Sequence, residues 1–246
     1  MATDIAGLTQ AVVAITRGYG DSKPWWRGHS NIDWPLLPRL YRRGLSDKEH
    51  NINSRFRMMA KARYANCPRS DAPFPWLFLM QHYCLPTRLL DWSESPLVAL
   101  YFALETDVDE ASDATVWALL PTGLNLQQMG EAKICLYGSR SLGRLGAEAF
   151  VRNTKNPDTR ILSVLTEQSD PRHMVQQSTF TIHGSNTPIE VLPDADAYLA
   201  RIRIPEKTKP AFRQILSLLG ISRATLFPDL ENLAMELSAL DFSELA

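Results

Sequence analysis

The sequence is poor in cysteine. Its 246 residues include only Cys67, Cys84 and Cys135, which stand far apart. They form neither the paired framework of a disulfide-stapled domain nor the Cys-x-x-Cys spacing of a zinc site. The five histidines show no metal-ligand spacing either. We therefore expect free thiols in a reducing cytoplasm and no bound metal.

Long hydrophobic runs are also missing. The longest, over residues 97–104, is far below the roughly 20 residues that a membrane-spanning helix needs. The N-terminus lacks the basic segment followed by an apolar stretch that is typical of a secretion signal. We expect a cytoplasmic chain with no membrane partner.

An excess of charge of one sign is absent as well. The 26 basic and 27 acidic residues give a net charge of −1, so the whole chain has no attraction to nucleic acid or anionic membrane, and only a local basic patch could supply one. With 45% hydrophobic residues and no break in composition, residues 1–246 can bury one large core. We expect a single domain.

Several common site motifs are absent too. The sequence has no Walker A motif, no Rossmann glycine motif after a strand, no HExxH and no GxSxG. The glycines at 18 and 20 follow a predicted helix, so they do not form a phosphate loop. The familiar signatures of P-loop, Rossmann, zinc-protease and α/β-hydrolase sites are thus excluded.

The periodicity that is present predicts an α+β fold. Apolar residues recur at helical spacing, beside capping or proline signals, over residues 4–17, 47–65, 73–83, 97–104, 210–219 and 228–240. The terminal helices should lie within about 3–18 and about 208–241, and residues 124–170 should be mostly helical. Short apolar or alternating runs predict strands over 24–28, 87–91, 115–120, 179–183 and 198–204. We expect a mixed or antiparallel central sheet flanked by helices, with an irregular surface stretch over 31–43.

The first segment with chemical character combines aromatic residues with an arginine. Trp25 and Trp26 precede Arg27, and Gly28 and His29 follow it. An arginine beside indole faces and a glycine that permits close backbone approach suits a phosphate or an adenine-type ring. The same residues also fit two core tryptophans with an arginine held by a carboxylate, for which Asp91 is a candidate.

The second segment, residues 81–92, sets polar side chains among apolar ones. The polar residues are Gln81, His82, Tyr83, Thr87, Arg88 and Asp91. Polar groups in a buried segment must find partners. They therefore form either a structural network or the lining of a pocket, and the end of a predicted helix at this position favours the pocket.

Two further polar positions stand next to predicted elements. Ser95 precedes Pro96 and is an N-cap candidate for the helix over 97–104, and the turn with Ser93 could contact a phosphate or ribose at the helix start. Gln176 opens the strand over 179–183; a solvent-facing edge is the simpler interpretation of such a position.

These segments closely resemble the FRG-domain family, whose name comes from an aromatic-Arg-Gly motif. The resemblance rests on residues 26–30, 34–42, 81–92, 95–103, 176–183 and 226–230, in family order. It covers about residues 20–235. Cys84 and Ser178 depart from it, because the family usually has glycine at both places.

The family's layout is similar to that of the ADP-ribosyltransferase superfamily. That resemblance implies an arginine on the first strand that holds the pyrophosphate and ribose of NAD, a serine at a strand-to-helix turn and a polar residue that opens a late strand. Arg27, Ser93 or Ser95, and Gln176 or Gln177 occupy these places. The superfamily's late-strand glutamate is missing, and glutamine cannot act as a general base.

The resulting hypothesis is an NAD-consuming ADP-ribosyltransferase-like enzyme or NAD glycohydrolase, acting as a toxin or phage-defence effector. Its catalytic residues would be Arg27, Asp91 and Gln176, with Glu94 and Glu190 as other carboxylate candidates. Substrate binding would use the remaining site residues Trp26, Gly28, His29, Gln81, His82, Thr87, Arg88, Ser93 and Ser95. The acceptor would be a protein or nucleic acid, with a neutralising partner in the cell.

Two alternatives stay open beside this hypothesis. A noncatalytic module could bind a nucleotide or nucleic acid through Trp25, Trp26, Arg27, Arg39 and Arg88. An interaction domain could use the same side chains only as core.

Overall fold

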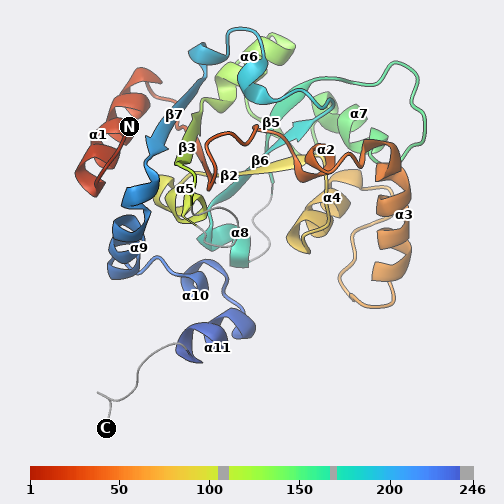
Figure 1. Ribbon diagram of the computed structural model, residues 1–246. Helices are drawn as coiled ribbons and strands as arrows, with labels where there is room; N and C mark the ends of the chain where they lie inside the picture. The colour runs from red at the N-terminus through yellow and green to blue at the C-terminus, as the bar shows by residue number, and fades with distance from the viewer. Residues whose placement is uncertain (105–110, 167–170, 239–246) are drawn as a thin grey trace.

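The computed structural model of the chain describes residues 1–104, 111–166 and 171–238 (Figure 1). The helices are α1 Ile5–Gly18, α2 Arg39–Arg42, α3 Glu49–Ala60, α4 Pro73–His82, α5 Pro96–Ala103, α6 Pro121–Met129, α7 Arg140–Glu148, α8 Pro171–Val175, α9 Lys209–Leu218, α10 Arg223–Leu226 and α11 Leu230–Ser238. The strands are β1 Trp25–His29, β2 Leu89–Ser93, β3 Ala114–Leu119, β4 Cys135–Leu136, β5 Ile161–Leu165, β6 Ser178–His183 and β7 Leu199–Ile204.

The seven strands form one mixed sheet in the order β4-β5-β6-β2-β1-β3-β7. The short β4 runs parallel to β5, and the other neighbouring strands of this sheet are antiparallel. Strands far apart in sequence therefore lie side by side, as Figure 1 shows at the centre of the molecule. The expected α+β class with a mixed central sheet is confirmed.

The two central strands part from each other. β1 is aligned with β3 over five residue pairs, and β2 with β6 over five. Between β1 and β2 only one pair, Trp26 with Ser93, is aligned. The sheet is thus opened in its middle, beside two of the segments that carry the polar motifs.

Two groups of helices cover one face of the sheet. Helices α1, α5 and α9 pack on β1, β3 and β7, and α4 and α7 pack on β2, β5 and β6. A Cβ on Gly28 would lie 1.9 Å from the carbonyl oxygen of Ala99 and 2.4 Å from the backbone nitrogen of Ala103. The glycine of the aromatic-Arg-Gly segment thus lets α5 lie directly on β1.

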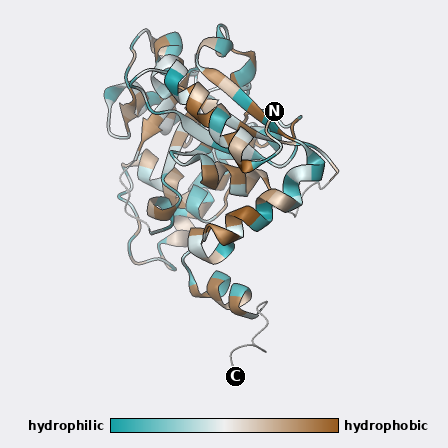
Figure 2. Cartoon of the chain, turned by 90° about the vertical axis from the view of Figure 1, so that its left-hand side faces the viewer, coloured by the Kyte–Doolittle hydropathy of each residue, from teal (hydrophilic) through white to brown (hydrophobic). Residues whose placement is uncertain are grey.

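The opposite face buries a second set of aromatic residues. Trp25, Trp92 and Trp117 pack there with Leu36 and Ile189, which come from irregular segments. Because successive strand residues face opposite sides, Trp25 and Trp26 enter different layers, and both are buried. Figure 2 shows hydrophobic residues, in brown, on many of the helices and strands, interspersed with hydrophilic ones in teal.

The local signals at several helix ends are confirmed. The Asp4 carboxylate accepts a hydrogen bond from the Gly7 backbone N–H at 2.7 Å, which caps α1. The Ser95 hydroxyl accepts one from the Val98 N–H at 3.4 Å at the start of α5. Gly220, with φ of +73°, follows α9 as predicted.

Other predictions need correction. Residues 124–170 are not mostly helical, because β4 and β5 lie between α6, α7 and α8. The stretch over 31–43 does not simply run over the surface, since Leu36 and Leu40 are fully buried and α2 ends it. Helix α3 ends at Ala60 rather than at 65. The predicted elements over 167–170 and 239–241 lie outside the described residues.

Membrane insertion has no support in the described ranges, where no helix combines the length and hydrophobicity that crossing a bilayer requires.

Candidate functional site

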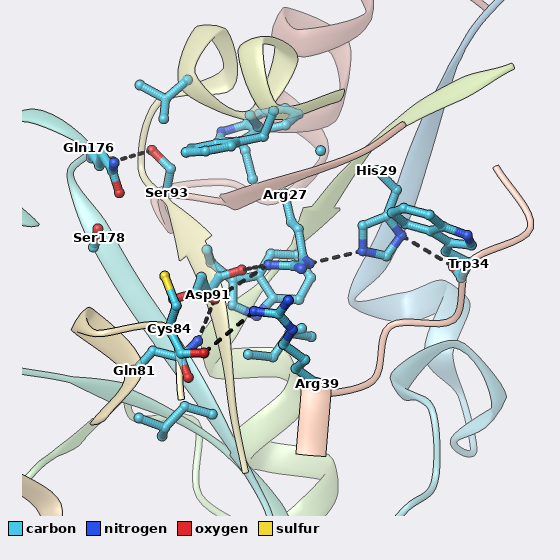
Figure 3. A pocket seen from close by; sticks show the side chains of 18 of the residues that line it. Arg27, His29, Trp34, Arg39, Gln81, Cys84, Asp91, Ser93, Gln176 and Ser178 are labelled. Carbon is cyan, nitrogen blue, oxygen red and sulfur yellow. Dashed lines mark hydrogen bonds and ion pairs between the residues drawn. The ribbon is translucent and has the colours of Figure 1, made fainter. Parts of the chain in front are cut away.

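A cavity of about 710 Å³ lies where β1 and β2 part. Its walls come from both strands, from α2, α4, α5 and α8, and from the segments around α8 and before α2 (Figure 3). The polar lining residues are Arg27, His29, Ser30, Arg39, Arg42, Arg43, Gln81, Asp91, Ser93, Arg172, Gln176 and Ser178. This volume is within the range of sites that enclose small molecules, about 300–1,000 Å³.

Arg27 lies at the centre of the cavity. Its Nε donates a hydrogen bond to Nε2 of His29 at 2.9 Å, and its Nη1 donates one to the backbone carbonyl of Asp91 at 2.6 Å. The Asp91 carboxylate is farther from Nη1, at 3.9 Å. The guanidinium therefore occupies the gap between the parted strands and keeps donors available for a ligand.

His29 is held as a neutral imidazole. Its Nδ1 lies 3.2 Å from the carbonyl oxygen of Trp34, which can only accept, so Nδ1 carries the proton and Nε2 accepts from Arg27. Burial lowers the pKa of His29 well below 6.5, and the positive charges of Arg27 and Arg42 lower it further. His29 thus orients Arg27 without adding charge.

A chain of hydrogen bonds fixes the Asp91 carboxylate. The Thr87 hydroxyl donates to Oε1 of Gln81 at 2.5 Å, and Nε2 of Gln81 donates to Oδ2 of Asp91 at 2.7 Å. The Thr87 oxygen also accepts the Leu89 backbone N–H at 3.1 Å. These contacts determine which end of the Gln81 amide faces Asp91. The Asp91 side chain remains 52% exposed, so a ligand can reach it.

The opposite wall of the cavity contains Ser93 and Gln176. The Ser93 hydroxyl donates to the backbone carbonyl of Gln176 at 2.7 Å, which ties the end of β2 to the start of β6 (Figure 3). The Gln176 side chain donates to the Leu226 carbonyl at 3.0 Å. The proposed serine and late-strand positions thus face the same cavity as Arg27.

The lining is strongly basic. Its described residues include five arginines and one carboxylate, that of Asp91. Burial, partly offset by Asp91 and reinforced by Arg42, lowers the pKa of Arg27 to about 10. Burial and Arg39 lower the pKa of Arg42, which lies 5.7 Å from the ring centre of Trp34. A cluster of arginines such as this favours a ligand with more than one negative charge.

Residues 22–112 match the family model of the FRG domain. The match supports the resemblance to the FRG family over this part of the chain. No curated protein matches the chain, and no solved structure matches it either.

The FRG match includes the strand with Arg27 and the segment from Gln81 to Ser93, but it ends before α8 and β6. The wider extent of the resemblance, to about residue 235, and a single FRG-like domain over 1–246 therefore remain predictions. The match also leaves the relation to ADP-ribosyltransferases as a proposal.

Four of the site residues predicted from the sequence lie outside this cavity. Arg88 is buried against Glu49, Thr87 is buried behind Gln81, Ser95 serves as the cap of α5, and His82 lines a second cavity. Arg88 is not available to a ligand because its Nε and Nη2 donate hydrogen bonds to the two Glu49 carboxylate oxygens, at 2.8 and 2.5 Å.

The carboxylate candidates are also separated by the fold. Asp91 lines the cavity, whereas Glu94 and Glu190 do not. Both Glu190 oxygens accept the Leu36 backbone N–H, at 3.2 and 3.1 Å, a structural contact. Similarly, Gln176 lines the cavity while Gln177 is exposed beside it.

Sequence reasoning did not identify Arg42, Arg43, Arg172 or Trp34 as site residues. Trp34 and Arg42 lie within residues 34–42, a segment on which the resemblance to the FRG family rests, and that resemblance was the available signal. Arg172 reaches the cavity only because α8 packs beside the start of β6. No local pattern marks it.

The two departures from the FRG pattern differ in their consequence. Cys84 has φ of +59°, a left-handed conformation in which glycine is the unstrained residue. Ser178 is not among the described residues with positive φ, although its neighbour Gln177 is, at +47°. The positive φ therefore explains why the family has glycine at the place of Cys84, whereas φ gives no such reason at the place of Ser178.

Proposed function

We propose that the cavity binds NAD and that the chain breaks the bond between nicotinamide and ribose, as a glycohydrolase or a transferase. The observation that carries this proposal is the group of five arginines, with Arg27 at its centre, that lines the cavity between β1 and β2, where Asp91 is the one carboxylate among the described lining residues. A pyrophosphate supplies the negative charge that such a cluster needs, and bidentate arginine contacts suit its oxygens.

The proposed reaction uses the two charged residues Arg27 and Asp91. Nicotinamide leaves with the electron pair of its bond to C1′ of the ribose, and positive charge develops on the sugar. Asp91 stabilises this charge. The oxygen of water, or a nucleophilic atom of an acceptor, then bonds to C1′, and its proton passes through the Asp91 carboxylate to solvent. Arg27 holds the phosphates while these bonds change.

Asp91 takes the place of the missing late-strand glutamate in this scheme. Gln176 lies on the opposite wall and can hydrogen-bond a ribose or amide, but it cannot accept a proton at neutral pH. Its side chain already donates to the Leu226 carbonyl. Gln176 therefore positions the substrate, and the proton-accepting role belongs to Asp91, whose carboxylate Gln81 orients.

The first test is nicotinamide release from NAD, with and without a bacterial lysate, followed by mass spectrometry. Wild type should release nicotinamide, and Arg27→Ala should lower the rate by at least about 10²-fold. Arg17→Ala, at an exposed position of α1 outside the cavity, is the matched control. Equal turnover by folded wild type and Arg27→Ala would reject the assignment.

A second variant separates binding from cleavage. Asp91→Asn keeps the shape of the side chain but removes its negative charge and its proton-accepting ability. We expect about 10²-fold slower release with NAD affinity, measured by calorimetry, unchanged or tighter because a negative charge has been removed. Lost affinity together with lost release would instead give Asp91 a binding role.

A noncatalytic nucleotide-binding module is the second candidate. It is favoured by the 52% exposure of Asp91 and by its hydrogen bond with Gln81, which satisfies part of its accepting capacity. Under this alternative, NAD or another nucleotide raises the melting temperature of the wild type but not of Arg27→Ala, and no nicotinamide appears.

A role as a toxin or phage-defence effector belongs to the same proposal. Induced expression in bacteria should then arrest growth with the wild type and lower cellular NAD or label a macromolecule, whereas Arg27→Ala should be tolerated. A gene product that restores growth would identify the neutralising partner. Equal growth of wild type and Arg27→Ala would argue against this role.

A further inference from the structure

A second cavity, of about 240 Å³, lies beside the first. Its lining is rich in rings, and none of the described residues that line it is Asp, Glu, Lys or Arg. The lining residues are Tyr64, Asn66, Pro68, Pro75, Phe78, Leu79, His82, Tyr83, Tyr137, Thr166 and His173. At this size it holds part of a ligand, such as one planar ring, rather than a whole nucleotide.

The two cavities share their dividing wall. At the end of α4, Gln81 lines the first cavity and His82 lines the second. In α8, Arg172 lines the first and His173 the second. In both helices, a residue that lines the second cavity therefore directly follows a residue that lines the arginine-rich cavity.

The rings of the second cavity are arranged to receive another ring. His82 and Tyr83 meet edge to face with centroids 4.8 Å apart, and Tyr64 and Tyr83 do so at 6.3 Å. Tyr83 is 55% exposed and Tyr64 is 37% exposed. The fold thus leaves two tyrosine rings open to solvent at a ring-lined hollow, where a base can stack.

The edge of this cavity is basic. Residues 55–69, which run from α3 to the loop with Tyr64, carry five basic and no acidic side chains, in a chain of net charge −1. Lys61, Arg63 and Arg69 are exposed. Arg69 pairs with Asp71, but both side chains are more than 70% exposed, so the pair is weak and can open toward a phosphate.

We infer that the second cavity and residues 61–69 bind single-stranded nucleic acid. One base stacks on Tyr83 and Tyr64, and Lys61, Arg63 and Arg69 contact the phosphates. A ring-lined cavity with a basic edge fits this partner, because each nucleotide has a base that can stack on the rings and a phosphate that the basic side chains can contact. The basic edge repels a basic peptide, and the described lining residues contain no Lys or Arg side chain to pair with an acidic one.

The position of this site makes the bound strand the acceptor of the transfer, an assignment that rests on the proposed function. A nucleophilic nitrogen or oxygen of the strand would bond to C1′ of the ribose as nicotinamide departs with the electron pair. The acceptor's proton would pass to Asp91 and then to solvent. The shared wall at Gln81 and His82 places the two substrates next to each other.

The binding test uses fluorescent single-stranded RNA and DNA of about 12 nucleotides in anisotropy titrations without NAD. Because NAD is absent, the result is independent of whether the chain cleaves it. We expect binding that weakens steeply with salt and exceeds duplex binding. Tyr83→Ala should weaken it about ten-fold, and the triple change of Lys61, Arg63 and Arg69 to Gln should flatten its salt dependence.

Arg17→Gln is the matched charge control, because Arg17 is exposed on α1 and lines neither cavity. It should bind as the wild type does. No anisotropy change with RNA or DNA at low salt, or equal binding by wild type, Tyr83→Ala and the triple variant, overturns the inference. Adding NAD then tests the acceptor role: label on the oligonucleotide supports it, and label on lysate protein alone overturns it.

Discussion

Arg27 and Arg88 stand near each other in the sheet region but have opposite surroundings. Arg88 precedes β2 and donates to both oxygens of Glu49 and to the Leu145 carbonyl at 3.0 Å, with side-chain exposures of 8% and 6% for the ion pair. Arg27 on β1 makes two hydrogen bonds to neutral acceptors and lies 3.9 Å from an exposed carboxylate.

The pKa values of the two arginines move in opposite directions. Burial acts to lower the pKa of Arg88, but the hydrogen bonds and negative charge of Glu49 outweigh it and raise the pKa overall. Burial lowers the pKa of Arg27 to about 10, because Asp91 compensates only in part. A saturated arginine is structural, whereas one left with unused donors in a cavity is available for a ligand.

The largest expected effect is on the Arg88 pair. Glu49→Gln leaves a buried guanidinium without its counter-charge, so the free energy of unfolding should fall by about 3–5 kcal/mol. Urea denaturation measures this directly. The double variant Glu49→Leu with Arg88→Met removes both charges and should recover much of the loss. A loss below about 1 kcal/mol, as for surface pairs, would make Arg88 no more structural than Arg27.

Arg27→Met should show the reverse pattern. The free energy of unfolding should change by less than about 1 kcal/mol, because the pair with Asp91 is long and half exposed, while nicotinamide release falls by at least about 10²-fold, equivalent to about 2.7 kcal/mol. Denaturation and turnover should be measured on the same preparation. A collapse of stability with Arg27→Met would move Arg27 to the structural class.

The sequence identified the residues in this comparison, but it did not show which arginine is structural and which one faces the cavity. Arg27, Arg88 and Asp91 were all site candidates, because polar groups among apolar residues mark both networks and pockets. Whether an arginine joins a structural network or lines a pocket depends here on Glu49, which lies on α3 and is marked by no local sequence pattern. The FRG resemblance also covers both arginines and does not separate them.

The fold was predictable where caps and periodicity agree. Asp4, Ser95 and Gly220 mark helix ends that the structure confirms. Strand β5 was missed because a five-residue buried run, with Ser163 at its centre, cannot be told from part of a helix by periodicity. The parting of β1 and β2 is a tertiary feature, so the sequence indicated a pocket at residues 81–92 but not the arginines from α2 and α8 that line it.

The third prediction uses His29, the neighbour of Arg27. Its folded pKa lies well below 6.5, so below about pH 6.5 the unfolded chain binds a proton that the folded chain does not. His29 should therefore cost about 1.4 kcal/mol of stability between about pH 7.5 and about pH 5.5. Thermal or urea unfolding of wild type and His29→Gln at both pH values measures this difference.

Arg27→Met sharpens the same measurement, because removing one of the charges that lower the His29 pKa should reduce the pH dependence. The pKa of the buried His183 is lowered to about 3 by burial and by the charges of Arg27 and Arg88, so His183 also makes the wild type less stable at low pH. The comparison of wild type with His29→Gln, which keeps both arginines, isolates the contribution of His29. Identical pH slopes for wild type, His29→Gln and Arg27→Met would mean that His29 is not held neutral by its site.

The smallest effect is expected at Cys84, in the turn between the Gln81 wall of the cavity and the buried Arg88. Its φ of +59° strains a residue with a Cβ by about 1–2 kcal/mol, part of which glycine loses again through the greater freedom of the unfolded chain. Cys84→Gly should therefore raise the free energy of unfolding by about 0.5–1 kcal/mol, and Cys84→Ala, which keeps the Cβ, should not.

The Cys84 carbonyl accepts from Nη1 of Arg39 at 3.5 Å, so nicotinamide release should be measured as well. If Cys84→Gly is the less stable variant, the turn tolerates its left-handed residue without strain, and the family's glycine needs another explanation.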